Sequence, residues 1–204
     1  MGYSIISATF CVLVVLSNIL SAKMVDCGWI VIPAGLIIYP LTFVLSDLVN
    51  EIFGPQKTRA MVYMALGTAL LSYCLIQLTL YLPAQASDDA QAFQRVMGLS
   101  GLRIFSSLAA YLVAHLLDIQ LYALLKKWTG LRFLWLRNNS STWVSQLVDT
   151  ILIDLLFLYG GLGISMAQVI PIMVVSFAYK ALFSVANTPV LYLLVYLMRR
   201  RRVA

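Results

Sequence analysis

Six long runs of apolar residues are the feature that most constrains this chain. A helix needs about 20 mostly apolar residues to cross a bilayer core of about 30 Å. Globular domains carry about 25% charged residues, whereas this chain is 11% charged and 62% hydrophobic. These values exclude an ordinary water-soluble domain. The expected spans are residues 4–22, 29–53, 60–82, 102–125, 142–164 and 169–198.

The spans are expected to form an all-α membrane protein, with six transmembrane helices in one bundle. Open sheet edges cannot face lipid, and the sequence lacks the alternation typical of barrel strands. A length of 204 residues leaves room for one six-helix domain over residues 1–204. Outside the membrane, a short helix is expected at 88–97, and residues 126–139 are expected to lie at the interface.

Positively charged residues predict the orientation of the chain. They gather in the connections after the second and fourth spans and in the tail, and positive charge accumulates on the cytoplasmic side. Both termini are therefore expected in the cytoplasm, and the first span is expected to be retained rather than cleaved as a signal peptide. The net charge of +6 is interpreted as a topology signal and an anionic-lipid contact, not a nucleic-acid site. The ten basic residues are Lys57, Arg59, Lys126, Lys127, Arg132, Arg137, Arg199, Arg200, Arg201 and Arg202.

Polar and ionisable side chains recur inside the expected spans. Each ionisable one costs about 2.5–3.5 kcal/mol on insertion scales, so such residues usually face a bundle interior or a cavity. Asp47 and Glu51 are four residues apart and share a helical face, which Tyr39 and Phe43 continue. Because five of the six spans carry such groups, the pattern predicts one polar interior that a solute could cross. The other candidates are Asn18, Arg103, His115, Asp118, Gln146, Asp149, Asp154, Lys180 and Asn187.

Each of these residues also has a structural interpretation. Asp47 and Glu51 approach the cytoplasmic end of their span, where they could cap the helix. Lys180 could form a structural ion pair with Asp149 or with Asp118. His115 and Asp154 could serve only to hydrogen-bond within the core or to hold a helix interface.

Several carboxylates, two kinds of amide, one lysine and nearby rings suit a flat heterocycle rich in hydrogen-bond donors. A guanine-like edge presents two adjacent N–H donors, which one carboxylate can accept side by side. Asn18, Asn187 or Gln146 could then hydrogen-bond the remaining polar atoms of the base. Rings such as Tyr39 and Phe43 could stack on the base. These residues permit such a ligand without selecting it.

Residues 39–54, YPLTFVLSDLVNEIFG, resemble the signature of the queuosine precursor transporters, also called the Vut or vitamin-uptake-like family. The stretches 103–118, 144–150 and 179–189 and the early pair Ser17-Asn18 support the resemblance in order along the chain. The family implies a six-helix inner-membrane importer of 7-deazaguanines: 7-cyano-7-deazaguanine, 7-aminomethyl-7-deazaguanine or queuine. His115 departs from the pattern, since an uncharged polar residue is expected there. The matching positions are Asn18, Asp47, Glu51, Arg103, Asp118, Gln146, Asp149 and Lys180.

The sequence contains no Walker-type phosphate loop, so the chain is not expected to hydrolyse ATP. Transport would be facilitated, ion-coupled or driven by a separate ATPase. Asp118, His115 and Asp149 at membrane depth motivate a proton-coupled cycle. In a second hypothesis, Asp149 or Asp47 binds the edge of the base, and Lys180 keeps that carboxylate ionised.

Two other functions are compatible with a small polytopic membrane protein. One is a substrate-binding subunit of an energy-coupling-factor vitamin or nucleobase transporter, which would need a complex with two ATPases. The other is an intramembrane protease, but no aspartate follows a Gly-x-Gly turn and Ser165 lacks the second glycine of a serine-protease setting. The chain is therefore not expected to be an enzyme, and no cofactor or metal site is expected. A homodimer is left open, although no Gly-x-x-x-Gly motif favours one.

Overall fold

The computed structural model describes residues 2–21, 23–26, 31–83, 88–98, 101–130, 133–161 and 163–203. Within these residues, six helices are long and apolar enough to cross a membrane, which confirms the six predicted spans. The elements in chain order are α1 (Gly2–Leu20), β1 (Met24–Asp26), β2 (Val31–Pro33), α2 (Gly35–Phe53), α3 (Pro55–Tyr81), α4 (Asp88–Gly98), α5 (Gly101–Thr129), α6 (Leu134–Ile153), the π-helix η1 (Asp154–Tyr159) and α7 (Met166–Val203).

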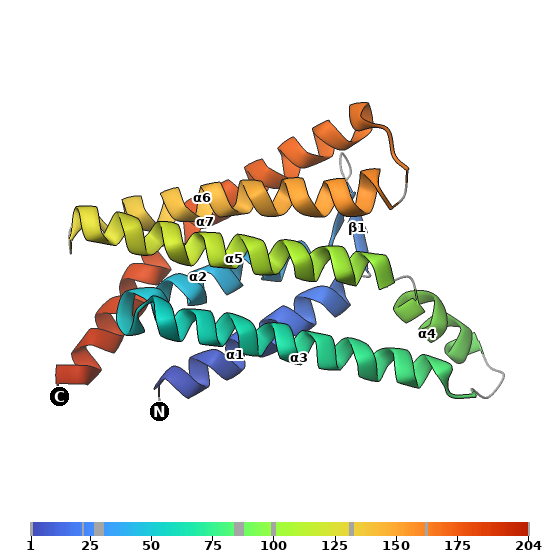
Figure 1. The fold of residues 1–204 in the computed structure, drawn as a ribbon, viewed down its shortest axis with the longest axis horizontal. Coiled ribbons are helices and arrows are strands. Elements are labelled where there is room, and N and C mark those ends of the chain that lie inside the picture. The colour runs from blue at the N-terminus through green and yellow to red at the C-terminus, as the bar shows by residue number, and fades with distance from the viewer. Residues whose placement is uncertain are drawn as a thin grey trace.

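The long helices are arranged so that both ends of the chain lie at one end of the molecule (Figure 1). The β1–β2 hairpin and the short helix α4 lie at the opposite end, which is the pattern expected of an even number of crossings. The structure confirms the predicted helix at 88–97, since α4 covers Asp88–Gly98.

The start of the second span differs from the prediction. Its helix begins at Gly35, and Val31–Pro33 instead pairs antiparallel with Met24–Asp26, with Val25 opposite Ile32. Ile32 is β-branched and precedes a proline, which disfavours the helical conformation at that residue. Residues 29 and 30, which the prediction also placed in this span, lie outside the described part of the chain.

The connection predicted to lie at the interface, 126–139, is mostly helical. Helix α5 continues to Thr129 and α6 begins at Leu134, so the turn between them is short, with Gly130 and Phe133 at positive φ. Arg137, counted among the basic residues of a connection, instead lies inside α6 with 1% of its surface exposed. It is buried because a glutamate on α2 neutralises its charge.

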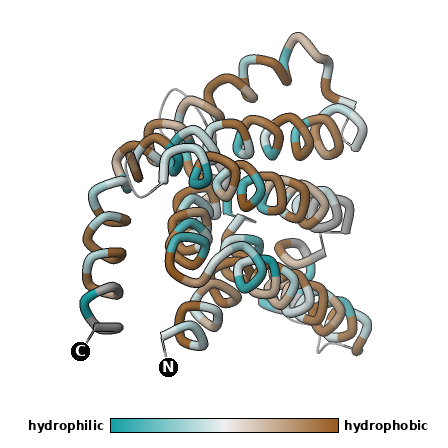
Figure 2. Tube along the Cα trace, turned by 60° about the vertical axis from the view of Figure 1, so that its left-hand side comes forward, coloured by the Kyte–Doolittle hydropathy of each residue, from teal (hydrophilic) through white to brown (hydrophobic). Residues whose placement is uncertain are grey.

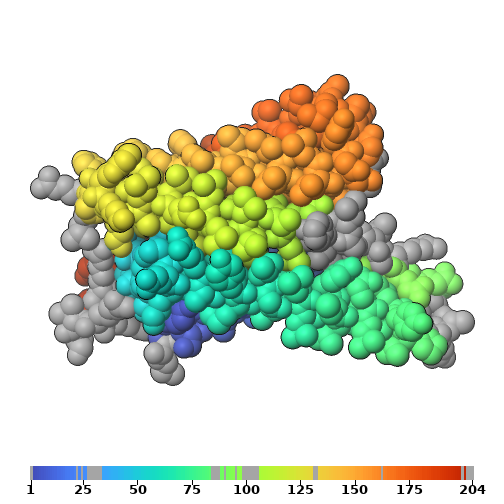
Figure 3. Space-filling model, in the orientation of Figure 1, coloured from blue at the N-terminus to red at the C-terminus, as the bar shows by residue number. Residues whose placement is uncertain are grey.

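Apolar side chains face outwards over much of the molecule. Large residues such as Leu71, Val174 and Leu182 are more than half exposed, and hydrophobic segments extend along the helices (Figure 2). A soluble monomer rarely exposes so much apolar surface, whereas a bilayer covers it. Helix α5 packs along both α3 and α6 (Figure 3).

Candidate functional site

A cluster of buried polar side chains lies where α2, α5, α6 and α7 meet. Five predicted site residues, whose insertion into a membrane is costly, each expose no more than 5% of their surface. They are Asp47, Asp118, Gln146, Asp149 and Lys180. Buried groups of this kind need partners. Their partners divide the cluster into three parts.

The first part is the ion pair between Lys180 and Asp149. Lys180 Nζ lies 2.7 Å from Asp149 Oδ2 and also donates to Thr150 Oγ1 at 3.0 Å. The other Asp149 oxygen accepts from the Tyr39 hydroxyl at 3.0 Å. Of the two partners that the sequence left open for Lys180, the structure therefore shows Asp149. Both Asp149 oxygens accept hydrogen bonds from protein groups.

The second part is a pair of carboxyl groups. Asp47 on α2 and Asp118 on α5 lie within hydrogen-bonding reach of each other. Thr142 donates to Asp47 Oδ2 at 3.3 Å, and Ser145 donates to Asp118 Oδ1 at 3.2 Å. Neither Asp47 Oδ1 nor Asp118 Oδ2 accepts a hydrogen bond from an N–H or O–H group of the described residues.

The third part surrounds Glu51. Its Oε2 lies 3.0 Å from Arg137 Nη2 and 3.2 Å from Lys126 Nζ, and it accepts from the Tyr122 hydroxyl at 3.1 Å. Arg137 also donates to the Gly130 carbonyl oxygen at 3.0 Å. Glu51 therefore ties α2 to α5 and α6 as part of a charge network.

A small cavity opens onto the first two parts. Its walls include Phe43, Asp47, Asn138, Gln146 and Lys180. Its free volume is about 10 Å³, room for about one water molecule. Three buried acceptors on this wall, Asp47 Oδ1, Asn138 Oδ1 and Gln146 Oε1, have no hydrogen-bond donor among the described residues. A buried acceptor without a donor is costly, so this arrangement suits a ligand that brings donors with it.

His115 lies beside this cavity in a box of aromatic rings. Its imidazole stacks on Phe43, with ring centroids 4.1 Å apart, and lies 4.6 Å from the Tyr111 ring. Its Nε2 is 3.4 Å from Thr42 Oγ1, and its side chain is fully buried. His115 thus packs against one face of the Phe43 ring.

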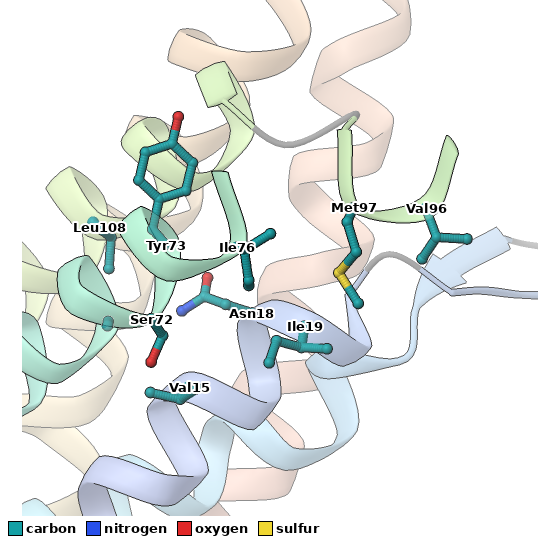
Figure 4. A pocket seen from close by; sticks show the side chains of 10 residues that line it. Val15, Asn18, Ile19, Ser72, Tyr73, Ile76, Val96, Met97 and Leu108 are labelled. Carbon is teal, nitrogen blue, oxygen red and sulfur yellow. The ribbon is translucent and has the colours of Figure 1, made fainter. Parts of the chain in front are cut away.

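Two predicted amides do not join the cluster. Asn18 Nδ2 donates to the Val14 carbonyl oxygen at 3.0 Å, and its Oδ1 accepts from Ser107 at 2.8 Å. It lines a separate, mostly apolar cavity of about 30 Å³ between α1, α3, α4 and α5 (Figure 4). Asn187 donates to the Phe183 carbonyl oxygen of its own helix at 3.0 Å.

The two remaining predicted residues are Arg103 and Asp154. The Arg103 side chain lies outside the part of the structure that is described. Asp154 is buried at the start of η1, and its Oδ2 accepts no hydrogen bond from the described residues. No group of three or more His, Cys, Asp or Glu side chains among the described residues is arranged to hold a metal ion.

Two buried residues of the site were missed in the sequence. Asn138 lines the cavity, and Ser145 donates to Asp118 Oδ1 at 3.2 Å. Ser184, which the sequence places on the same helical face as Lys180, also lines the cavity and donates to Asn139 Oδ1 at 2.9 Å. The run Asn138-Asn139-Ser140-Ser141-Thr142 was a usable signal, because it is polar and uncharged directly before an apolar run. The prediction began the span at Thr142, the last residue of this run.

Residues 33–194 match the family described as "Putative vitamin uptake transporter". The chain belongs to this family. Every residue that lines the small cavity, from Pro40 to Ser184, falls within the matched range, whereas Asn18 precedes it. This member of the family thus carries its polar interior in the part of the chain that the family shares.

The chain is also similar to a "Probable queuosine precursor transporter" of Bacillus subtilis (strain 168). The two are 30% identical over 138 residues, which is 67% of this chain and 60% of that protein. The chain therefore spans about three fifths of the length of the relative it matches. No solved structure matches it significantly.

Proposed function

We propose that this chain imports queuosine precursors across the inner membrane, for salvage of the queuosine base of tRNA. The cargo is a 7-deazaguanine: 7-cyano-7-deazaguanine, 7-aminomethyl-7-deazaguanine or queuine. Transport is facilitated or ion-coupled, with residues 1–204 acting as one six-helix domain and both termini in the cytoplasm. Membership of the family and the name of the Bacillus subtilis relative support this function.

The observation that carries the proposal is the set of unsatisfied acceptors around the cavity. Asp47, Asn138 and Gln146 line one small space, and each has a buried oxygen without a donor among the described residues. A 7-deazaguanine offers several N–H donors in one plane, and a carboxylate can accept two adjacent ones. Binding such a base would satisfy acceptors that are otherwise left unpaired.

The same cavity has groups for the rest of the base. An ammonium has three N–H donors, and Asp149 and Thr150 take two of those of Lys180. The third can bond the carbonyl oxygen of a guanine-like ring. The Phe43 ring, held against His115, offers a flat apolar surface for stacking. Because both Asp149 oxygens are already bonded, Asp47 is favoured over Asp149 as the acceptor for the base edge.

The cavity is too small for a bicyclic base in this conformation. Room for about one water molecule means that α2, α6 and α7 must separate to admit the cargo. A closed site with unsatisfied polar walls is expected of a carrier that opens to one side at a time. The conformation therefore fits a closed step of a transport cycle.

Rescue of queuosine in tRNA tests this function. The chain is expressed in bacteria that lack precursor synthesis and their own importer, and each of the three bases is supplied separately at low concentration. We expect queuosine with at least one base that the host can convert, loss of that signal with Asp47→Asn, and an unchanged signal with Asp154→Asn. Both variants must first be shown to reach the membrane in equal amounts.

Absence of queuosine with every base, from a protein shown to be in the membrane, would contradict the proposal. A second assay separates a self-sufficient carrier from an ATPase-dependent binding subunit. The purified chain in proteoliposomes should exchange external for internal base without ATP or any other protein. Exchange only in the presence of an added ATPase complex would favour the binding subunit.

A further inference from the structure

The acids in the polar interior differ in how their charge is balanced. Glu51 is paired with Arg137 and Lys126, and Asp149 is paired with Lys180. Neither Asp47 nor Asp118 forms a salt bridge with any described side chain. Their carboxyl groups instead lie next to each other, against the hydroxyl groups of Thr142 and Ser145 on one turn of α6, with 1% and 0% of each residue exposed.

Two ionised carboxylates cannot lie side by side in a buried site without a compensating positive charge. Two hydroxyl groups on α6, those of Thr142 and Ser145, donate to the pair, and hydroxyl groups supply dipoles rather than charge. Each carboxyl still has one buried oxygen with no donor among the described residues. A single proton placed between the two groups would satisfy both conditions.

Charged and titratable groups approach the pair from the neighbouring helices. Helix α1 carries no formally charged side chain, and the charges of α3 lie at its exposed N-terminal end, at Lys57 and Arg59. The positive groups of α6 and α7 nearest the pair are engaged by other acids, as described above. The titratable and charged groups that these elements carry in the interior are Tyr39 and Glu51 on α2, Tyr111, His115 and Tyr122 on α5, Arg137 and Asp149 on α6, Asp154 on η1 and Lys180 on α7.

We propose that Asp47 and Asp118 hold one proton between them and that this proton is imported together with the base. In the closed state the proton forms the O–H bond of Asp118 and is donated to Asp47, which keeps its negative charge. The Asp47 oxygen that accepts this proton has a second lone pair, which remains an acceptor for the N–H edge of the cargo. The co-import of the proton rests on the import function proposed above, whereas the protonated pair does not depend on that function.

The proton is thereby coupled to opening and closing. It enters from external water when the site opens outwards, binds Asp118 and permits α2, α6 and α7 to close around the base. When the site opens inwards, the base leaves, the O–H bond of Asp118 breaks and the proton passes to cytoplasmic water. Without the proton, repulsion between the two carboxylates disfavours closing of the dry, base-filled site, so the base does not cross alone. The empty carrier returns with water hydrating both carboxylates in place of the base and the proton.

The first test needs no substrate. Infrared spectra of the purified protein at neutral pH report the C=O stretch of any protonated carboxyl group. Difference spectra against wild type should show that Asp47→Asn and Asp118→Asn each remove the same band, because each breaks the shared site. The matched control, Asp154→Asn, replaces a buried aspartate outside the pair and should leave that band in place. Absence of a band common to the two variants would overturn the protonated pair.

The second test measures coupling in proteoliposomes, with 7-cyano-7-deazaguanine as a neutral cargo and the membrane potential clamped at zero. One proton per molecule should drive about tenfold accumulation for each pH unit, since a unit corresponds to 1.36 kcal/mol. Asp118→Asn, whose amide can still donate to Asp47, should retain exchange and lose accumulation. Asp154→Asn should accumulate like wild type.

The outcomes distinguish the two proposals. Exchange by wild type with no accumulation under a pH gradient would overturn co-import and leave the proposed cargo intact. Accumulation by Asp118→Asn equal to wild type would overturn the role of the pair. If wild type carries no deazaguanine at all, the import function fails and co-import fails with it, while the infrared band still decides whether the pair holds a proton.

Discussion

The ammonium of Lys180 on α7 and the carboxylate of Asp149 on α6 form a salt bridge of 2.7 Å, with both side chains at most 5% exposed. Tyr39 on α2 donates to the other oxygen of the same carboxylate. One acid thus joins three helices around the cavity. Because the bridge is buried, neither charge can be hydrated if its partner is removed.

Replacing Lys180 with methionine should therefore destabilise the protein strongly. Breaking a buried pair costs about 3–5 kcal/mol, which for a chain of this size lowers Tm by about 6–20 °C. The double variant Lys180→Met/Asp149→Asn should recover most of this loss, because no unpaired charge remains. Thermal unfolding in one detergent, followed for both variants, measures the difference. A single variant as stable as wild type would contradict the assignment.

Glu51 should affect stability more than cargo affinity. The variant Glu51→Gln removes the charge that balances Arg137 and Lys126, so we expect a fall in Tm, again by several degrees. The cavity wall does not include Glu51, so the Kd of the folded protein for its base should change by less than about threefold, less than 1 kcal/mol. Tyr122→Phe, which removes one neutral partner from the same oxygen, should have the smaller effect on Tm. A large rise in Kd without a loss of stability would instead place Glu51 at the cargo.

Much of the fold and part of the polar cluster follow from the sequence because the membrane penalises polar groups so heavily. Burying an ionisable side chain in a span restricts it to the bundle interior, and Asp47, Asp118, Asp149 and Lys180 all lie there. The particular partners do not follow. Whether Lys180 meets Asp149 or Asp118 depends on helix rotation and register between α6 and α7, which periodicity within one helix does not give.

The short amide side chains of asparagine show a second limit of prediction from the sequence. Asn18 and Asn187 each bond a carbonyl oxygen one turn back in their own helix, a local alternative open to any such side chain. Asn138 is buried in the site although the prediction placed it in the connection before the fifth span. Helix α6 begins at Leu134, and Arg137, which pairs with Glu51, is buried in the same turn. The boundary was misplaced because charge was treated as evidence for an exposed connection.

The unpaired amides give a direct prediction for binding. Gln146→Met and Asn138→Leu keep most of the side-chain volume and remove an acceptor from the cavity wall. Each should weaken binding of the base by about 1–3 kcal/mol, or roughly 5- to 150-fold in Kd, because a donor of the cargo is then left unpaired. Gln77→Met on α3 is the matched control and should bind normally. Isothermal titration of the purified variants gives the values, and unchanged affinity in both cavity variants would exclude these amides from the site.

The contact between α1 and α2 depends on a residue without a side chain. A Cβ at Gly35 would overlap the Ser17 carbonyl oxygen and Ser21 Oγ, whereas a Cβ at Gly67 on α3 would meet nothing within 4 Å. Gly35→Ala should therefore force the two helices apart and destabilise the protein by at least about 1–3 kcal/mol, the usual range for overpacking. Gly67→Ala makes the same chemical change in open space and should leave stability unchanged or raise it by up to about 1 kcal/mol. Thermal unfolding of the two variants side by side tests the close approach, and equal melting temperatures would show that α1 does not pack on α2 at this point.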